Sequence, residues 1–313
     1  MRILFMGTPD FALPTLEAIY NSTDTLVGVF TQPDKPKGRG YTLTPPPVKV
    51  FAAEKGIPVY QPTTLRSHES LELIKSLSPD LIVVVAYGKI LPPAVLEAAP
   101  HGCINVHGSL LPKYRGAAPM QRAIIDGEAV TGVTTMYMAE GLDTGDMLLK
   151  AEFPITDDAN FETVHDGLAA LGAELLIKTV EALKAGTLVR TAQDDSLSTY
   201  AAKIEKTDCQ INFAHDANTI HNAIRGLSPI PLAFTHTPDG KLLKIIKAAV
   251  SDRACDNAEC GEVIMTDEAK GCFTVACGKG AIDVYAVLPE GKGRMSAADF
   301  MRGRKIAKGD ILN

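Results

Sequence analysis

The chain has 313 residues, of which 46% are hydrophobic and 22% are charged, and its formal net charge is −6. This composition is typical of a globular protein with room for two cores, and the acidic balance argues against a protein that coats nucleic acid indiscriminately. No apolar stretch approaches the roughly 20 residues of a membrane span, and the apolar start at residues 1–7 is too short for a signal peptide.

The first half of the chain alternates strand-like and helix-like patterns. Strands are predicted at residues 3–6, 26–30 and 81–86, and helices at residues 12–20 and 92–99. The run 81–86 is continuously apolar and rich in β-branched residues, as expected of a central parallel strand that is buried on both faces. The pattern therefore predicts an α/β fold with right-handed βαβ units and a doubly wound, mostly parallel sheet.

The first predicted turn, residues 7–12, offers one possible alternative function. In such folds a ligand binds beyond the carboxyl ends of the strands. A dinucleotide would require three glycines in this turn, whereas the segment Gly-Thr-Pro-Asp-Phe-Ala has one, followed shortly by proline. A nicotinamide-dependent dehydrogenase is therefore a weak alternative.

Residues 103–119 carry the most informative segment of the chain. The run Cys-Ile-Asn-Val-His predicts the end of a buried strand, and side chains two apart on a strand share a face, so Asn105 and His107 should project together. A second turn-rich stretch, residues 141–146, supplies Asp143 and Asp146. An amide, an imidazole and a carboxylate suit acyl transfer: the amide donates to an oxyanion, the imidazole moves protons and the carboxylate orients it. The spacing alone does not separate the two aspartates.

The strand and helix patterns continue to about residue 185, and the texture of the sequence changes from about residue 204. Residues 131–138 and 147–153 are predicted to pair as edge strands, residues 161–185 form a helical stripe, and the polar residues 187–203 are predicted to be a linker. Beyond residue 204 we expect a short helix near 216–225, capped by Asp216, and a last helix from residue 296. Strands are expected at 242–250, 262–265, 272–277 and 282–288, which suggests a small barrel. The predicted division is thus 1–186, a linker 187–203, and 204–313.

The motifs described above resemble those of the folate-dependent formyltransferases. The resemblance rests on Asn105-x-His107, on the loop Ser109-Leu110-Leu111-Pro112, on Arg115-Gly116 and on Asp143. Further segments are similar to the branch of that family that acts on initiator tRNA: residues 7–11, 30–34, 84–88, 115–119 and 141–146. The likeness runs through the whole chain and is densest up to about residue 153.

The resemblance implies a Rossmann-like formyltransferase core followed by a small, OB-like β-barrel domain that binds tRNA. It implies transfer of a formyl group from 10-formyltetrahydrofolate to the α-amino group of initiator methionyl-tRNA, by direct attack of the amine through a tetrahedral intermediate. Asn105, His107 and Asp143 would be catalytic, and Asp146 would be structural. The protein would be a cytoplasmic monomer with no membrane partner, and its six cysteines are compatible with a reducing compartment.

The resemblance also implies a folate pocket. Backbone groups and aliphatic side chains suit a planar pterin, and no metal is required. The expected folate-binding residues are Ser109, Leu110, Leu111 and Pro112 from one loop and Tyr87, Gly88, Ile90 and Leu91 from another. The spacing of Cys255 and Cys260, and of Cys272 and Cys277, is poor for structural zinc, so these thiols are expected to be buried or idle.

Residues 34–47 form a basic segment rich in glycine and proline. Such a segment is often only a solvated connector, but Lys35, Lys37 and Arg39 bring three cations together, and the resemblance implies that they contact the acceptor end of the tRNA. Arg39 matches an arginine that is important in those enzymes. A cluster of cations near the C-terminus could contact phosphates or could be a solvated helix: Lys292, Arg294, Arg302, Arg304, Lys305 and Lys308.

Two alternatives remain open from the sequence. One is a folate-dependent formyltransferase or a formyl-folate hydrolase that acts on a small molecule; the relatives that formylate glycinamide ribonucleotide lack the basic segment and the second domain. The other is a non-catalytic RNA-binding protein on a decayed core, against which the intact set Asn105, His107 and Asp143 argues.

Overall fold

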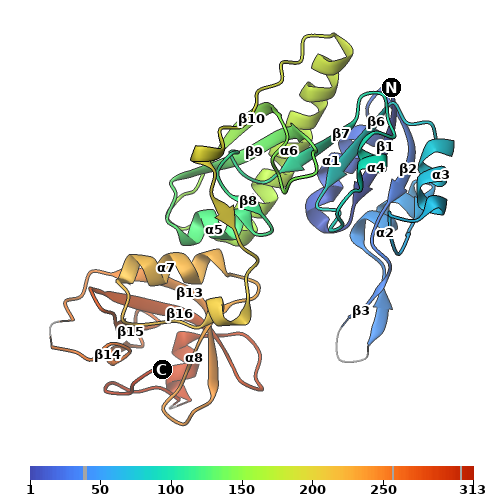
Figure 1. Cartoon of the computed structure of the whole chain (residues 1–313). Coiled ribbons are helices and arrows are strands. Elements are labelled where there is room, and N and C mark those ends of the chain that lie inside the picture. The colour runs from blue at the N-terminus through green and yellow to red at the C-terminus, as the bar shows by residue number, and fades with distance from the viewer. Residues whose placement is uncertain (38–40, 256, 304) are drawn as a thin grey trace. The chain divides into compact units, whose positions relative to one another are not determined.

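The structure is a computed structural model that describes residues 1–37, 41–255, 257–303 and 305–313. The contacts between Cα atoms divide the chain into two compact units (Figure 1). The first unit comprises Met1–Gly116, Val130–Pro154 and His165–Ala201, and the second comprises Ala117–Ala129, Ile155–Val164 and Ala202–Asn313. Two internal segments, residues 117–129 and 155–164, therefore belong to the second unit, which no local pattern in the sequence indicated.

The first unit is built on a seven-stranded sheet with the order β10-β9-β7-β6-β1-β2-β5. Its strands are β1 (Arg2–Gly7), β2 (Thr25–Phe30), β5 (Val59–Tyr60), β6 (Leu81–Val85), β7 (Cys103–His107), β9 (Val130–Tyr137) and β10 (Met147–Pro154). The strands β7, β6, β1, β2 and β5 pair in parallel, whereas β9 and β10 are antiparallel at one edge. All five residues of β6 are buried. The prediction of a mostly parallel sheet is confirmed.

Helices connect the strands of this sheet. They are η1 (Asp10–Ala12), α1 (Leu13–Tyr20), α2 (Pro47–Glu54), α3 (His68–Ser76), α4 (Pro93–Leu96) and α6 (Phe161–Lys184). Helix α4 is shorter than the predicted 92–99, because the chain turns after Leu96. Inside α6, Gly167 faces the ring of Phe153, and a Cβ atom there would lie 2.3 Å from ring carbons. Close approach to the sheet therefore explains a glycine inside a helix.

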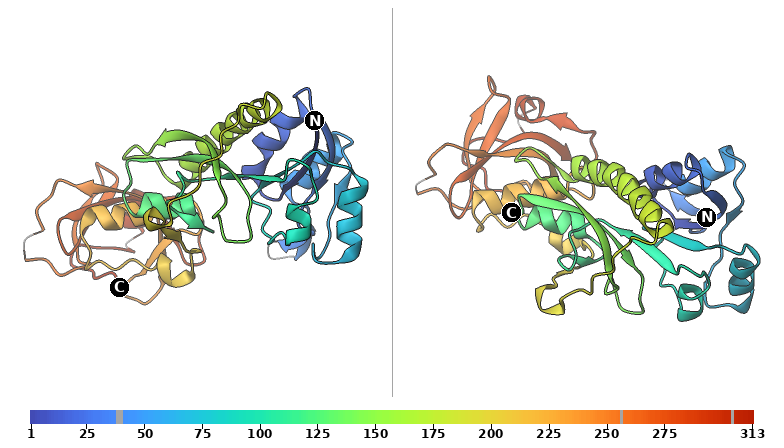
Figure 2. Two further views of the ribbon diagram at one scale, coloured as in Figure 1. Left: turned by 45° about the horizontal axis from the view of Figure 1, so that its top comes forward. Right: turned by 90° about the horizontal axis from the view of Figure 1, so that it is seen from above.

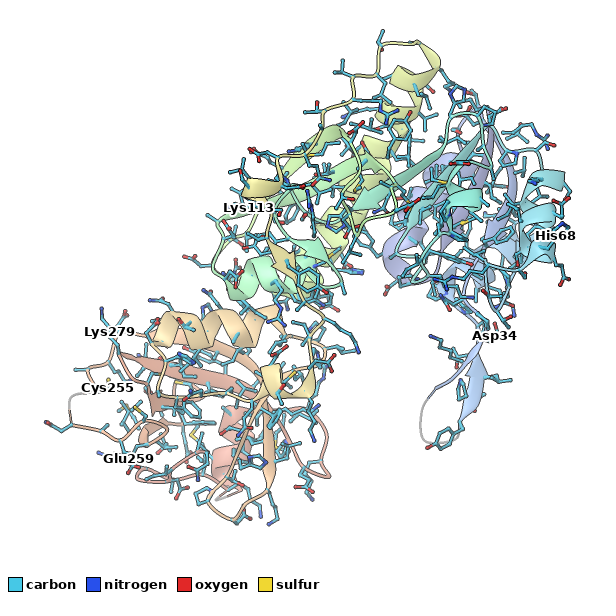
Figure 3. All side chains as sticks on the ribbon, in the orientation of Figure 1. Asp34, His68, Lys113, Cys255, Glu259 and Lys279 are labelled. Carbon is cyan, nitrogen blue, oxygen red and sulfur yellow. The ribbon has the colours of Figure 1, made fainter. Side chains whose placement is uncertain are left out.

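The basic segment folds as a two-stranded ribbon and is not only a loop. Strands β3 (Lys35–Lys37) and β4 (Thr42–Thr44) pair antiparallel, and the ribbon projects from the sheet (Figure 1). Asp34 lies at the root of the ribbon (Figure 3). Its carboxylate accepts hydrogen bonds from Lys49 Nζ at 2.7 Å and from Gln61 Nε2 at 2.7 Å. These two bonds lower the pKa of Asp34, the larger effect coming from Gln61. Arg39 lies outside the described residues.

The predicted linker, residues 187–203, makes specific contacts within the first unit up to Ala201. Thr191 bridges to Met147, a short helix η2 (Asp195–Leu197) follows, and β11 (Tyr200–Ala201) pairs in parallel with β8 (Arg115–Gly116). This segment therefore returns to strand β8, which begins three residues after Pro112.

The second unit contains an antiparallel sheet with the order β12-β13-β16-β15-β14, with β17 beside β16. Its elements are α5 (Pro119–Ile125), η3 (Lys206–Cys209), α7 (Ala217–Gly226), β12 (Ala233–His236), β13 (Leu242–Ser251), β14 (Val263–Asp267), β15 (Cys272–Ala276), β16 (Ala281–Pro289), β17 (Met295–Ser296) and α8 (Ala297–Arg302). Asp216 caps α7 by accepting from Thr219 N–H at 3.1 Å, as predicted. Helix α7 lies on β13 (Figure 1 and Figure 2). β12 and β14 are the two ends of this strand order. Among the described strand pairings none joins them, so the strands form an open sheet and not a closed barrel.

Candidate active site

The loops after β1, β2 and β6 are tied together at the carboxyl ends of the strands. Tyr87 C=O accepts hydrogen bonds from Thr8 Oγ1 at 3.0 Å and from Gln32 Nε2 at 3.1 Å, and Gln32 N–H donates to Thr8 Oγ1. The backbone turns sharply here, with positive φ at Ala86 and at Gly88. Ligands of parallel α/β sheets bind at this edge. These hydrogen bonds therefore hold the three loops in a fixed arrangement where a ligand would bind.

Strand β7 brings Asn105 and His107 to the same edge. Asn105 lies between Val84 of β6 and Met136 of β9 in the sheet, and its side chain is half-buried. His107 is the last residue of the strand and is only 6% exposed. Because the two residues are two apart on one strand, they share a face, as the sequence predicted.

The two ring nitrogens of His107 have different neighbours. Nε2 lies 2.9 Å from the carbonyl oxygen of Tyr114, and because a carbonyl only accepts, this hydrogen bond requires a proton on Nε2. Nδ1 lies 3.8 Å from Oδ2 of Asp143, which is ion-pair distance when the ring is charged. The structure brings His107 and Asp143 together although 35 residues separate them in the sequence.

Asp143 is held in place by the backbone around it. Its φ of 52° lies in the left-handed region, and its Oδ2 accepts a hydrogen bond from Gly116 N–H at 2.8 Å. Gln193 Nε2 donates to the carbonyl oxygens of Asp143 at 2.7 Å and of Gly145 at 2.8 Å. Gln193 therefore fixes the turn that points the carboxylate towards His107.

Gln193 is itself held by Arg115. The Nε–H of Arg115 donates to Gln193 Oε1 at 2.9 Å, and its other arm donates to the exposed Asp195 at 2.7 Å. Arg115 is only 9% exposed. Sequence reasoning used Arg115 as part of a motif but missed Gln193, because Gln193 stands in a polar stretch without periodicity. The only signal available was the unusual density of polar residues in that stretch.

Asp146 has a different partner. Its Oδ2 accepts from Arg190 at 3.0 Å and 2.9 Å, and the Arg190 guanidinium lies over the Tyr137 ring, 4.4 Å from its centroid. Asp146 thus anchors the C-terminal end of the 141–146 turn. This contact agrees with the structural role expected for Asp146.

Two of the four side chains of the loop Ser109–Pro112 are buried inside the protein. Ser109 is fully buried and its hydroxyl donates to Lys113 C=O at 2.7 Å. Thr134 Oγ1 donates to Ser109 C=O and accepts from Leu111 N–H, and Leu111 is buried beside Met136 and Met147. What this loop can offer a ligand is therefore its backbone together with the half-buried Leu110 and Pro112.

The second expected folate segment divides in the same way. Tyr87 and Leu91 are buried in the core, and burial raises the pKa of Tyr87 to about 12, so its hydroxyl stays protonated. Gly88 supplies the positive φ of the turn. Ile90, in contrast, is 77% exposed, and Leu142 beside Asp143 is 58% exposed. Exposed apolar side chains of this size suit contact with a flat ring.

Two further features concern metals and membranes. Within residues 1–37, 41–255, 257–303 and 305–313, no three His, Cys, Asp or Glu side chains are grouped so that they could hold a metal ion. None of the helices in the described part of the chain combines the length and the apolar character that crossing a membrane requires.

Comparisons with known proteins identify the family. The formyl transferase family model matches residues 1–180, and the model of the formyl transferase C-terminal domain matches residues 203–305. The methionyl-tRNA formyltransferase of Geotalea uraniireducens is 50% identical over 312 residues, which cover 100% of this chain and 98% of that protein. The methionyl-tRNA formyltransferase of Syntrophus aciditrophicus is 49% identical over 313 residues, covering 100% and 99% of the two chains.

Solved structures share the fold at low sequence identity. HypX from Aquifex aeolicus in complex with tetrahydrofolic acid matches with a TM-score of 0.63 and 18% identity over 96% of this chain and 47% of that chain. An N-formyltransferase from Helicobacter canadensis matches with a TM-score of 0.66 and 21% identity over 90% and 98% of the chains. Together with the Asn105–His107 strand end and the Asp143 turn, the two family models and these full-length relatives establish that the chain belongs to the formyl transferase family.

Proposed function

We propose that this protein transfers the formyl group of 10-formyltetrahydrofolate to the α-amino group of initiator methionyl-tRNA. The observation that carries the proposal is the grouping of His107 with the Asp143 carboxylate, 3.8 Å from Nδ1, on the strand end that also presents Asn105. The full-length likeness to methionyl-tRNA formyltransferases, at about 50% identity, supports the choice of substrates. One chain supplies all three residues, so we propose that the protein acts as a monomer. We also propose that it works in the cytoplasm.

In the proposed reaction the neutral amine attacks the formyl carbon, and a tetrahedral intermediate forms. The Asn105 amide donates to the oxygen on which negative charge develops, and the His107 imidazole stabilises the same charge. The new C–N bond forms at the amine, the bond to N10 of the folate breaks, and the proton lost by the amine passes to N10 with His107 as the relay. Asp143 stabilises the imidazolium and holds the ring. No covalent bond to the protein is needed.

The folate would lie against the two loops at the carboxyl edge of the sheet. Residues Ser109–Pro112 offer backbone groups with Leu110 and Pro112, and the Tyr87–Leu91 loop offers backbone groups with the exposed Ile90. Such a surface has hydrogen-bonding groups for the pterin edge and aliphatic groups for its faces. The reaction requires no metal ion.

The β3–β4 ribbon would bind the acceptor end of the tRNA. Lys35, Lys37 and Arg39 supply positive charge for phosphates. Two exposed side chains of the same ribbon support this proposal: Tyr41 is 81% exposed and Leu43 is 66% exposed. Aromatic and apolar side chains beside cations suit unpaired bases, which stack on such groups.

A formyltransferase or a hydrolase with a small-molecule substrate is the alternative, and one assay separates the two. Purified protein is given 10-formyltetrahydrofolate, and release of tetrahydrofolate is followed with charged initiator tRNA, with uncharged tRNA, with methionine or with no acceptor. We expect release of tetrahydrofolate only with the charged tRNA. The His107→Ala variant serves as the blank and should release none. Equal release without acceptor would indicate a hydrolase, and release with the free amino acid would indicate a small-molecule enzyme.

The ribbon is tested by Arg39→Ala and Tyr41→Ala, with Lys75→Ala on the exposed face of α3 as the matched control. Loss of one base-stacking or phosphate contact costs on the order of 1–3 kcal/mol, so KM for the tRNA should rise about tenfold while the affinity for the folate stays unchanged. The Lys75 variant should behave as wild type. An equal loss of affinity for the tRNA and for the folate, or no loss for either, would contradict the proposal that the ribbon binds tRNA.

A further inference from the structure

Three of the six cysteines gather at one end of the C-terminal sheet. Cys277 directly follows β15, and Cys255 and Cys260 lie on the segment that joins β13 to β14. The two segments meet in the backbone, because Gly261 N–H donates to Ala276 C=O at 2.9 Å. Cys260 and Cys277, the residues next to this pair, are therefore brought close although 16 residues separate them. The proposed function uses none of these thiols.

Cys255 and Cys277 bind the same backbone oxygen. The thiol of Cys255 donates to Gly280 C=O with Sγ at 3.1 Å, and Cys277 N–H donates to the same oxygen at 2.9 Å. Because both bonds end on the Gly280 oxygen, the Cys255 sulfur lies within about 6 Å of the Cys277 nitrogen. The Cys255 thiol and the Cys277 backbone are therefore neighbours across one carbonyl oxygen, and closeness of the two residues is the first requirement for a disulfide.

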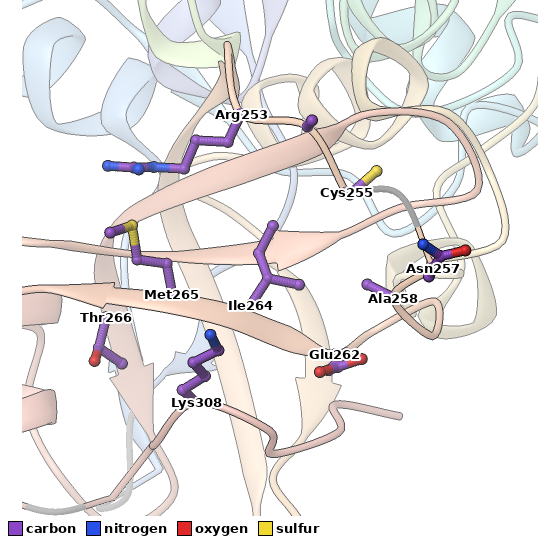
Figure 4. A pocket seen from close by; sticks show the side chains of 10 residues that line it. Arg253, Cys255, Asn257, Ala258, Glu262, Ile264, Met265, Thr266 and Lys308 are labelled. Carbon is purple, nitrogen blue, oxygen red and sulfur yellow. The ribbon is translucent and has the colours of Figure 1, made fainter.

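The two thiols differ in access and in reactivity. Cys277 is only 5% exposed, and burial, with smaller contributions from Cys255 and Cys260, raises its pKa to about 12. Cys255 is half-buried and lines a pocket of about 740 Å³, with Arg253, Glu262 and Lys308 among the other lining residues (Figure 4). A pocket of this size admits a small molecule. A reagent in solution therefore meets Cys255 before Cys277.

We propose that Cys255 and Cys277 form a redox-active dithiol that closes to an intramolecular disulfide when Cys255 reacts with a small-molecule disulfide such as oxidised glutathione. The Cys255 thiolate attacks one sulfur of the reagent, which forms a mixed disulfide and releases one glutathione thiol. The Cys277 sulfur then attacks the Cys255 sulfur and releases the second glutathione. The protein pair loses two protons and two electrons, and the reagent is reduced to two thiols.

Cys260 is the competing partner. It is exposed, and it lies on the same segment as Cys255. Its backbone neighbour Gly261 pairs with Ala276, whereas the Cys255 thiol itself reaches the oxygen bound by Cys277. The geometry therefore assigns the disulfide to Cys255 and Cys277 and leaves Cys260 as a surface thiol.

The test uses the reduced full-length protein, treated with oxidised glutathione and then alkylated, with the disulfides located by peptide mass spectrometry. The expected product is a Cys255–Cys277 link in the wild type and in Cys260→Ser, and no link in Cys255→Ser. Cys277→Ser should keep one glutathione on Cys255; because Cys277 is buried, Cys277→Ala provides a second variant without an unpaired hydroxyl. A Cys255–Cys260 link, or a lasting glutathione adduct on Cys255 in the wild type, would overturn the proposal.

Discussion

The contacts of Gln193 lead to a sharp prediction about catalysis. Its amide makes three hydrogen bonds: it donates to the carbonyl oxygens of Asp143 and Gly145, and it accepts from Arg115 Nε–H. No atom of Gln193 has an assigned part in the chemistry. Gln193→Ala should therefore act only by releasing the turn that carries the Asp143 carboxylate.

The size of the effect follows from these bonds. Each is worth roughly 0.5–1.5 kcal/mol net, and Gln193 is half-buried, so the lower part of the range applies and the sum is about 2 kcal/mol. If that energy holds Asp143 near His107 in the transition state, its loss lowers kcat by about 30-fold, since about 1.4 kcal/mol corresponds to tenfold. KM for the folate should change much less.

Two matched variants distinguish a loss of the position of Asp143 from a general loss of stability. Gln193→Glu keeps an oxygen for Arg115 but places a carboxylate oxygen against the two carbonyl oxygens, so it should be at least as impaired as Gln193→Ala. Asp195→Ala removes only the exposed partner of Arg115 and should cost no more than about 1 kcal/mol, with kcat close to wild type. The measurements are formylation at saturating substrates and thermal unfolding. A wild-type kcat in Gln193→Ala, or an equal loss in Asp195→Ala, would refute the reasoning.

Three further predictions concern the catalytic set and the pH dependence of stability. Asn105→Ala and His107→Ala should each lower kcat on the order of a hundredfold or more with unchanged circular dichroism, and near-normal turnover in either would contradict its assigned role. Asp143→Asn should be strongly impaired in the same assay and Asp146→Asn only mildly; the reverse order would make Asp146 the functional carboxylate. Burial opposes ionisation of Asp24, but its bonds to the N-terminal ammonium and a lysine lower its pKa below 3.8 on balance. The contribution of Asp24 to the free energy of unfolding is therefore complete above pH 3.8 and is lost as the pH falls through its pKa in the folded protein. In urea unfolding at decreasing pH below 3.8, Asp24→Asn should lose less stability than the wild type.

Much of the fold was determined by local sequence patterns. The apolar run 81–86 predicted a strand buried on both faces, and β6 (Leu81–Val85) is that strand. Asp216 predicted a helix start, and it caps α7. Asn105 and His107 could be placed on one face because the two-residue period of a strand is a local property. Burial periodicity, capping and alternation all act over a few residues, so they can be read from the chain directly.

The environment of the site was decided by the tertiary structure. Gln193 lies 50 residues from Asp143 and 78 from Arg115, yet these contacts aim the carboxylate at His107. Residues 187–203 look like a linker because their partners, among them Met147 and the Arg115–Gly116 strand, lie far away in the chain. A hydrogen bond between distant segments leaves no period in either of them. The sequence does not distinguish Asp143 from Asp146, whereas in the structure Arg190 binds Asp146. Which residue supports which group is settled only when the sheet brings the segments together.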